Sequence, residues 1–312
     1  MQVVLDTDPG VDDILALLWL LALDVRYKAD VIGITTAEGN LRRRATFNNA
    51  CRVLDLCRRT DLTLAKSASH AGKTAEHLNG VDGLVGLTSS MPAPSKSYES
   101  APRAPQLLER WLSDEGNEVT LLATGPVTNL EAVEVMSKGS LGQAKHIVAT
   151  AGTFMRGNVT PEAEFNAHFN PRALHRLFHA NANVTLIPLD VSRQFDLNLD
   201  HLRAAGFDED VTRVSRFVWR LVGATQKHLM SVDQPRFCAA DATAVAFAFY
   251  PELFETVSAY VKIETRANLE TTGKTFIEPH RTPNVSITRR VNIDRVREQM
   301  LSDLKQFSAM LR

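Results

Sequence analysis

The 312-residue chain is predicted to form one α/β domain with a mostly parallel central sheet flanked by helices. Three observations predict this class. Short apolar runs alternate with stretches of helical periodicity, which is typical of a parallel sheet covered by helices. No segment is rich enough in Gly, Ser or Pro to divide the chain, and the chain has no internal repeat. We therefore treat residues 1–312 as a single Rossmann-like domain.

The elements follow in chain order. Strands are expected at residues 2–6, 31–36, 119–123, 146–151 and 184–189. Helices are expected at residues 12–23, 41–58, 239–249 and 293–311, the last with an apolar stripe formed by Ile293, Val296, Met300, Leu304 and Phe307. Residues 91–105 contain four prolines and several serines, so we expect an exposed loop there.

Composition narrows the class of protein. The 35 basic and 36 acidic residues give a formal net charge of −1, so no surface for nucleic acid or an anionic membrane is indicated. Three cysteines cannot form a disulfide framework, and their number fits a reducing compartment. The apolar run at residues 14–23 follows two aspartates and is shorter than the roughly 20 residues of a membrane span. We expect a cytoplasmic protein in which this run is a buried helix.

An acidic run at the end of the first strand is the main functional signal. Asp6, Asp8, Asp12 and Asp13 fall within eight residues, and Pro9-Gly10 makes a tight turn between them. Crowded carboxylates need a cation, and oxygen ligands favour Ca²⁺ or Mg²⁺. A helix cap would need only one aspartate. A phosphatase of the haloacid dehalogenase type would need a later GDxxxD motif, which is absent.

The run resembles the DxDPGxDD signature of nucleoside hydrolases. Further segments match that family in order: Gly39-Asn40, Asn49, the TGPVTN turn at residues 124–129, the GNVTPEAEFN segment at residues 157–166, and Asp241 at a helix start. The resemblance spans residues 6 to about 250 and implies the nucleoside hydrolase fold. It also implies a role in purine or pyrimidine salvage and a homodimer or homotetramer.

The resemblance also implies roles for single residues. Ca²⁺ is expected on Asp8, Asp13, Asp241 and the carbonyl oxygen of Thr124, with Asp8 taking a proton from the bound water. Ribose is expected to hydrogen-bond to Asp12, Asn40, Asn158, Glu164 and Asn166, and Asn166 is counted as catalytic because amide oxygens stabilise an oxocarbenium-like state. If residues 164–166 are extended, Glu164 and Asn166 face one side and Phe165 is buried opposite.

The chain departs from the family pattern on the side of the leaving base. Ala240 stands where many relatives carry a histidine that can protonate the base, and Asn79 stands where many carry another histidine. Thr150 replaces a methionine, and Asn170 replaces an aspartate. We assign Asn79 and His228 to the substrate-binding set. His77, Gln234, Arg236 and Cys238 are weaker candidates for the leaving-group side.

Three functions remain open from the sequence. The first is hydrolysis of a ribonucleoside to ribose and base. The second is hydrolysis of another ribosyl or glycosyl compound, because only the base side is altered. The third is calcium-dependent sugar binding without turnover, which would not need Asp8 as a base. The chain lacks GxSxG, P-loop, GxGxxG and CxxC motifs, so serine hydrolases, NTPases and dinucleotide-binding enzymes lose their support.

Overall fold

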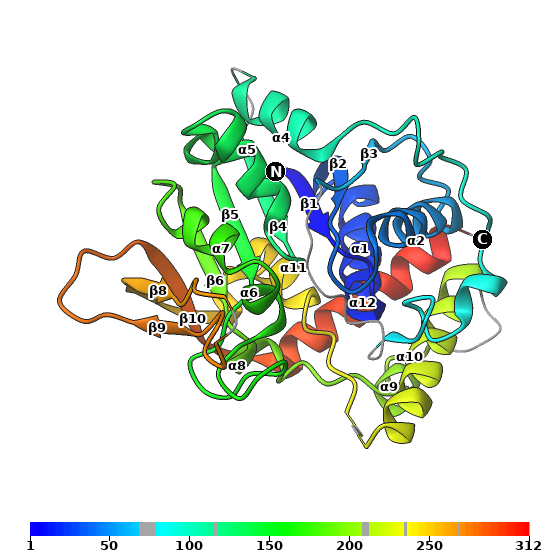
Figure 1. Cartoon of the computed structure of the whole chain (residues 1–312). Helices are drawn as coiled ribbons and strands as arrows, with labels where there is room; N and C mark the ends of the chain where they lie inside the picture. The colour runs from blue at the N-terminus through cyan, green and yellow to red at the C-terminus, as the bar shows by residue number, and fades with distance from the viewer. Residues whose placement is uncertain are drawn as a thin grey trace.

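The computed structural model describes residues 1–68, 79–114, 116, 118–207, 212–233, 236–267 and 269–311. Its centre is an eight-stranded sheet with the strand order β3-β2-β1-β4-β5-β6-β10-β7 (Figure 1). All neighbouring strands in it run parallel except β7, which pairs antiparallel with β10. A second sheet contains two antiparallel strands. The strands are β1 (Gln2–Thr7), β2 (Asp30–Thr36), β3 (Leu64–Ala65), β4 (Val119–Ala123), β5 (His146–Thr150), β6 (Val184–Ile187), β7 (Phe254–Ala259), β8 (Val261–Ile263), β9 (Thr275–Ile277) and β10 (Val285–Val291).

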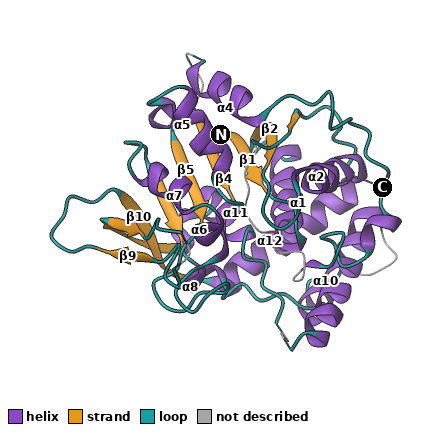
Figure 2. Cartoon of the chain, in the orientation of Figure 1, coloured by secondary structure: helices purple, strands orange, loops and turns teal. Residues whose placement is uncertain are grey.

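Helices cover the sheet and connect its strands (Figure 2). The α-helices are α1 (Val11–Val25), α2 (Arg43–Leu56), α4 (Ala104–Ser113), α5 (Thr128–Met136), α6 (Phe165–Phe169), α7 (Pro171–Phe178), α8 (Leu189–Ser192), α9 (Leu199–Ala204), α10 (Arg213–Ser231), α11 (Ala242–Phe249) and α12 (Ile293–Met310). The 3-10 helices are η1 (Leu87–Ser90), η2 (Ser140–Gln143) and η3 (Pro251–Leu253).

Two hydrophobic cores form on opposite faces of the sheet. One contains buried side chains of α1, α2, α10, α11 and α12, and the other contains those of α4, α5 and α7. The first strand contributes to both, because Val3 and Leu5 pack into the first core while Val4 packs into the second. Side chains alternate between the two faces of a strand, so an apolar run buried on both faces is what a central parallel strand requires.

The predicted fold class is confirmed, with corrections at element ends. The strand expected at 184–189 ends at Ile187, and Leu189 already begins α8 after Pro188. The helix expected at 239–249 begins only at Ala242. The proline-rich segment is a loop up to Arg103, and α4 begins at Ala104. Cys51 and Cys57 are buried in the first core. The sequence analysis did not predict β7 to β10 or α10.

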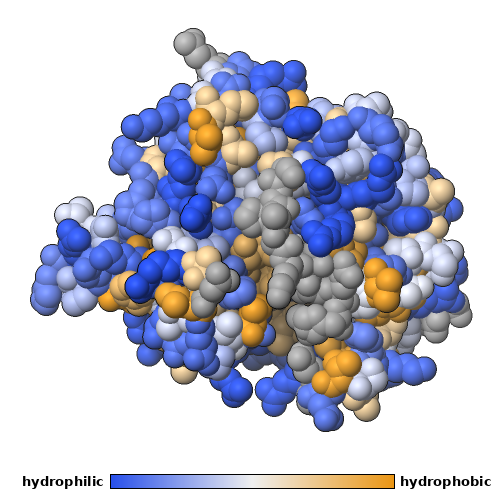
Figure 3. Space-filling model, in the orientation of Figure 1, coloured by the Kyte–Doolittle hydropathy of each residue, from blue (hydrophilic) through white to orange (hydrophobic). Residues whose placement is uncertain are grey.

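Among the described residues, none of the helices has both the length and the apolar character that a membrane span needs. The face seen in Figure 3 is mainly hydrophilic, with hydrophobic side chains scattered in small groups. The carboxyl ends of β1, β2, β4, β5 and β6 lie at one edge of the sheet, where open parallel sheets bind ligands.

Candidate active site

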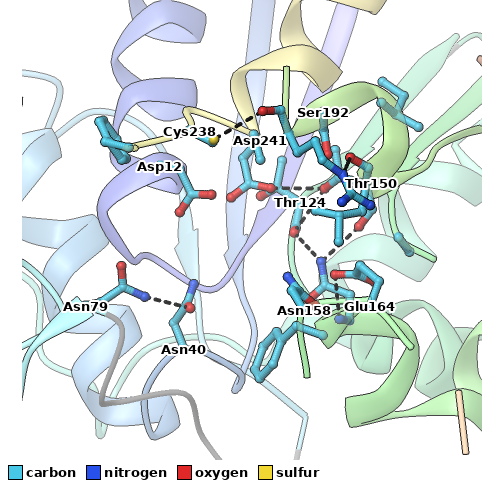
Figure 4. A pocket seen from close by; sticks show the side chains of 18 of the residues that line it. Asp12, Asn40, Asn79, Thr124, Thr150, Asn158, Glu164, Ser192, Cys238 and Asp241 are labelled. Atoms are coloured by element: carbon cyan, nitrogen blue, oxygen red, sulfur yellow. Dashed lines mark hydrogen bonds between the residues drawn. The ribbon is translucent and has the colours of Figure 1, made fainter. Parts of the chain in front are cut away.

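A cavity of about 260 Å³ opens at the carboxyl ends of the parallel strands. Loops after β1, β2, β4, β5 and β6 contribute to it, together with α10 and the segment before α11. Its described lining comprises Asp8, Asp12, Asn40, Asn79, Thr124, Thr150, Ala151, Asn158, Glu164, Phe165, Asn166, Ile187, Leu189, Ser192, Arg193, Thr225, Leu229, Arg236, Phe237, Cys238, Ala240 and Asp241. Figure 4 shows the polar side chains converging on a common space.

Asp13 does not line the cavity, but its carboxylate accepts hydrogen bonds that fix the turn between β1 and α1. Its Oδ1 accepts hydrogen bonds from Thr7 Oγ1 (2.5 Å), Thr124 Oγ1 (2.9 Å) and the Asp8 N–H (3.3 Å). Its Oδ2 accepts from the Gly10 N–H (3.1 Å) and from Asn40 Nδ2 (3.0 Å). The side chain is fully buried. These donors stabilise a carboxylate at a helix N-terminus, where the helix dipole also favours negative charge.

Asp8 is held at the cavity floor by its neighbours. Its Oδ2 accepts from the Asn40 N–H at 2.6 Å. A Cβ built on Gly125 would lie 2.4 Å from Asp8 Oδ1, and one built on Gly39 would lie 2.2 Å from Asp8 Oδ2. The carboxylate therefore occupies a slot that exists because both neighbouring residues are glycines.

Three carboxylates form a group that could hold a cation. Asp12, Asp13 and Asp241 each offer an oxygen within 4.8 Å of the others. The sequence predicts Asp8 on the metal and Asp12 on the sugar, and both assignments stay predictions. In the structure Asp12 lies beside Asp241, and Asp8 accepts a hydrogen bond from the Asn40 N–H. Asp8 still lines the same cavity, next to the group.

The electrostatics of this group fit a cation. Burial, and after it the charge of Asp13, raise the pKa of Asp12 from 3.8 to about 7. Burial and then Asp13 raise the pKa of Asp8 well above its ordinary value, and burial and then Asp12 do the same for Asp241. The largest charge effects on Asp8 and Asp241 come from other aspartates. Buried carboxylates in such a group need a positive charge, and hard oxygen donors suit Ca²⁺ or Mg²⁺.

Thr124 and Asn166 meet at the side of this group. The Thr124 carbonyl oxygen accepts from Asn166 Nδ2 (2.8 Å) and from Thr150 Oγ1 (3.1 Å). Asn166 Nδ2 also donates to the Thr150 carbonyl at 2.9 Å. Thr150 Oγ1 lies 3.1 Å from Asp241 Oδ1 as well, so its hydroxyl connects two of the expected metal ligands. The sequence analysis did not find this connection.

Glu164 and Asn166 both line the cavity, but not in the predicted conformation. The expected extended segment is wrong, because Phe165 begins α6 and Glu164 is the N-cap of that helix. Phe165 also lines the cavity and is not buried on the opposite side. Glu164 accepts backbone N–H bonds from Gly152 (2.7 Å), Asn166 (2.8 Å) and Ala167 (3.0 Å). Burial raises the pKa of Glu164 from 4.5 to about 7, while these donors lower it.

The opposite wall contains a pair of asparagines, which Figure 4 shows facing Asn158 and Glu164 across the cavity. Asn79 Nδ2 donates to Asn40 Oδ1 at 2.8 Å, and Asn79 Oδ1 accepts from the Val11 N–H at 3.4 Å. Asn40 in turn donates to Asp13. Asn79 thus orients Asn40 and connects it to the start of α1. Asn158 lines the other wall and is exposed.

The expected leaving-group residues are only partly at the cavity. His228 lies in α10 but is not among the described lining residues; Thr225 and Leu229 of that helix line the cavity instead. Ala240, Cys238 and Arg236 do line it. His77 and Gln234 lie outside the described residues. Arg193 and Ser192 line the cavity but were not predicted from the sequence, where their only signal is their place just after a predicted strand.

Several matched residues support the site without lining the cavity. Asp6 accepts from Thr35 Oγ1 (2.5 Å) and Asn129 Nδ2 (2.6 Å), and it is not part of the carboxylate group. Asn49 Nδ2 donates to the carbonyls of Pro9 (3.2 Å) and Asp82 (3.0 Å), which ties the acidic turn to the loop after residue 79. Asn170 Oδ1 accepts from the Ala173 N–H and so caps α7.

Comparisons with known proteins agree with this architecture. Residues 3–298 match the family model described as inosine-uridine preferring nucleoside hydrolase. The chain is 30% identical to the pyrimidine-specific ribonucleoside hydrolase RihA of Photobacterium profundum, with 97% of this chain and 96% of that protein covered. It is 32% identical to the protein of the same name from Shewanella sp. (strain MR-4), covering 88% and 86%. A solved purine-preferring ribonucleoside hydrolase from Gardnerella vaginalis shares the fold, with a TM-score of 0.89 at 22% identity over 99% of this chain and 100% of that one.

Proposed function

Because the chain belongs to the inosine-uridine preferring nucleoside hydrolase family and is therefore a hydrolase of N-glycosyl bonds, we propose that it cleaves ribonucleosides with a calcium-activated water. The observation that carries the calcium assignment is the buried carboxylate group, whose largest charge interactions are with one another. Its products would be ribose and the free base.

The donor set suits Ca²⁺, which binds six to eight oxygens in flexible geometry. Asp13, Asp241, Asp8 and the Thr124 carbonyl would hold the ion, with Asp12 beside them. A bound Ca²⁺ supplies a positive charge that lowers the pKa of a coordinated water. Neutralisation of the aspartates would also relieve the mutual repulsion that raises their pKa values.

We assign the role of the base to Asp8. Its carboxylate faces the cavity and is fixed by the Asn40 N–H and by the two glycines. In the proposed step the water oxygen bonds to the anomeric carbon, and one water proton passes to Asp8. The bonding pair of the C–N bond leaves with the aglycone. Positive charge develops on the sugar as in other glycoside hydrolyses, so nearby oxygens lower the barrier.

Asn166 would provide such an oxygen. Both of its Nδ2 hydrogens are used on the carbonyls of Thr124 and Thr150. No described residue donates to its Oδ1, so this oxygen can face the sugar. Asn40, Asn158, Asp12 and Glu164 would bind ribose hydroxyls from the two walls of the cavity. This arrangement matches a ligand that presents hydroxyl groups on several sides.

The similar proteins differ in the base that they prefer. The named relatives are pyrimidine-specific, whereas the named structural neighbour is purine-preferring. We propose a ribonucleoside or another riboside, handled in the cytoplasm as part of nucleoside salvage by a homodimer or homotetramer. A calcium-dependent sugar-binding protein remains the contrasting hypothesis, and it predicts binding of ribose without turnover.

Asp241→Asn tests the proposal because it removes one charge while keeping the side-chain shape. We expect Ca²⁺ affinity, measured by calorimetry, to fall at least roughly 100-fold and hydrolysis of inosine and uridine to fall with it. Asp6→Asn is the matched control, since Asp6 is buried at the same strand end but outside the carboxylate group. Its Ca²⁺ affinity should stay within about threefold.

Normal Ca²⁺ binding by Asp241→Asn would refute the metal assignment. Tight Ca²⁺ and ribose binding by the unaltered protein, without hydrolysis of any tested riboside, would instead favour the sugar-binding hypothesis.

A further inference from the structure

Arg193 lines the cavity and is held in one orientation. It follows α8, and its Nε donates to the Leu189 carbonyl at 3.0 Å. Its Nη2 donates to the Arg156 carbonyl (2.6 Å) and to Asp190 Oδ1 (3.2 Å). Asp190 is itself fixed, because it accepts from Thr153 Oγ1 at 2.8 Å and from the Phe154 N–H at 2.7 Å. A guanidinium tethered in this way loses little freedom when it binds a ligand.

One end of this guanidinium remains available. Arginine has five N–H donors, and the three contacts above use the single Nε hydrogen and the two Nη2 hydrogens. In the described part of the chain, nothing accepts from Nη1. Arg193 therefore presents a cation with two open donors at a cavity wall.

Arg193 belongs to the same wall as Ala240. The Cys238 thiol donates to the Arg193 carbonyl at 3.2 Å. The backbone of the adjoining segments is paired as well: the Ala239 N–H donates to the Phe195 carbonyl (2.8 Å) and the Leu197 N–H to the Phe237 carbonyl (2.9 Å). These contacts fix the position of Arg193 relative to residues 236–240.

This wall offers no described side chain suited to protonating a leaving group. Ala240 has no proton to give, and no described histidine lines the cavity. The Cys238 thiol donates to the Arg193 carbonyl, and burial raises its pKa to about 11. The Thr225 hydroxyl donates to the Leu221 carbonyl at 2.6 Å. Arginine does not release its proton in proteins, but it binds anions well.

We propose that Arg193 binds the aglycone as it departs with negative charge, so that the enzyme favours ribosides whose leaving group is stable as an anion. The inference rests on the proposed hydrolase function. When the C–N or C–O bond to the anomeric carbon breaks, both electrons leave with the aglycone, and the resulting anion meets Nη1 of Arg193. The water oxygen bonds to the same carbon, one water proton goes to Asp8, and the aglycone takes its proton from solvent after release.

The test measures kcat/KM for phenyl ribosides with leaving groups of increasing pKa, from 4-nitrophenyl to unsubstituted phenyl. Arg193→Met should lose at least roughly 10-fold on phenyl riboside and less than about threefold on 4-nitrophenyl riboside, because a poor leaving group depends more on charge stabilisation. The dependence of log kcat/KM on leaving-group pKa should therefore become steeper. Arg193→Lys should recover part of the loss, since it keeps the charge but not the planar tether.

Arg156→Met is the matched control, because Arg156 is an exposed neighbouring arginine whose carbonyl, and not its side chain, accepts the hydrogen bond from Arg193. It should leave the steepness unchanged. Equal losses by Arg193→Met across the whole series would overturn the inference and leave Arg193 a structural residue. Failure of the unaltered enzyme to cleave 4-nitrophenyl riboside with Ca²⁺ would instead refute the proposed function itself.

Discussion

Gly125→Ala should inactivate the enzyme while leaving the fold largely unchanged. The glycine does not need a positive φ, so alanine can adopt its backbone conformation. The added Cβ, however, would lie 2.4 Å from Asp8 Oδ1 and 3.0 Å from Asp8 Cγ. Ordinary contact between such atoms begins near 3.4 Å, so the Asp8 carboxylate must move by about 1 Å.

The magnitude follows from that displacement. The atoms nearest to the new Cβ all belong to the Asp8 side chain, so the clash is relieved mainly by displacing that side chain and not the surrounding core. A displacement of about 1 Å in a catalytic group can cost about 100-fold in rate. We therefore expect kcat to fall about 100-fold with a change in unfolding free energy under about 1 kcal/mol.

The assay combines steady-state hydrolysis of inosine and uridine with thermal unfolding of the same preparations. Gly142→Ala is the matched control, because a Cβ there would lie 3.4 Å from the Asn181 carbonyl oxygen, an ordinary contact. It should retain at least half of the activity. If Gly125→Ala keeps normal kcat, Asp8 is not the base, whatever its position in the cavity.

Two further predictions concern Thr150 and Asp303. Thr150→Val removes the hydroxyl that lies 3.1 Å from both Asp241 Oδ1 and the Thr124 carbonyl, so the Kd for Ca²⁺, measured by calorimetry, should rise about 10- to 100-fold. Thr150→Ser keeps the hydroxyl and should bind Ca²⁺ normally. Equal Ca²⁺ affinities of the two variants would contradict this prediction. Asp303→Ala leaves Trp19 Nε1, Tyr250 Oη and Arg26 without their buried acceptor. Urea denaturation should show that the free energy of unfolding falls by roughly 3 kcal/mol, while kcat/KM stays unchanged. In the control Asp200→Ala, which alters an exposed residue, the free energy of unfolding should also stay unchanged.

The sequence was informative where the chain keeps its functional groups close together. The strand end, the acidic turn and the helix start at Asp241 all follow local rules and were predicted with their place in the fold. The residue types alone do not separate Asp6 from Asp8, and only the family resemblance gave a role to Asp8 and none to Asp6. In the structure, Thr35 and Asn129 donate hydrogen bonds to Asp6, so Asp6 supports the site and does not line the cavity.

Other parts of the site depend on contacts between distant segments. A polar-apolar-polar triplet such as Glu164-Phe165-Asn166 fits an extended strand as well as a helix N-terminus. In the structure, three backbone N–H groups donate to the Glu164 carboxylate and stabilise the helix N-terminus. Asn79 acts on Asn40 across 39 residues. The orientation of Arg193 needs Asp190 and a carbonyl 37 residues away. No periodicity or spacing encodes such contacts.

The close, buried aspartates that would bind the cation should make the folding stability of the metal-free protein depend on pH. Folding raises the pKa of Asp12 to about 7 and raises those of Asp8 and Asp241 well above 3.8. Between about pH 4 and pH 7 the folded state then holds more protons than the unfolded state, so its stability falls as pH rises. Without Ca²⁺, Tm should therefore decrease from pH 5 to pH 8.

Bound Ca²⁺ should cancel this dependence, because the cation favours the ionised carboxylates and adds the binding free energy of the folded state. The Tm difference between Ca²⁺-loaded and chelated protein should thus widen with rising pH. Asp241→Asn should flatten the profile of the chelated protein and raise its Tm at pH 8, since it removes one repelling charge. A chelated protein that becomes more stable from pH 5 to pH 8 would show that these aspartates already have a positive partner, and the site would then have no need of a cation.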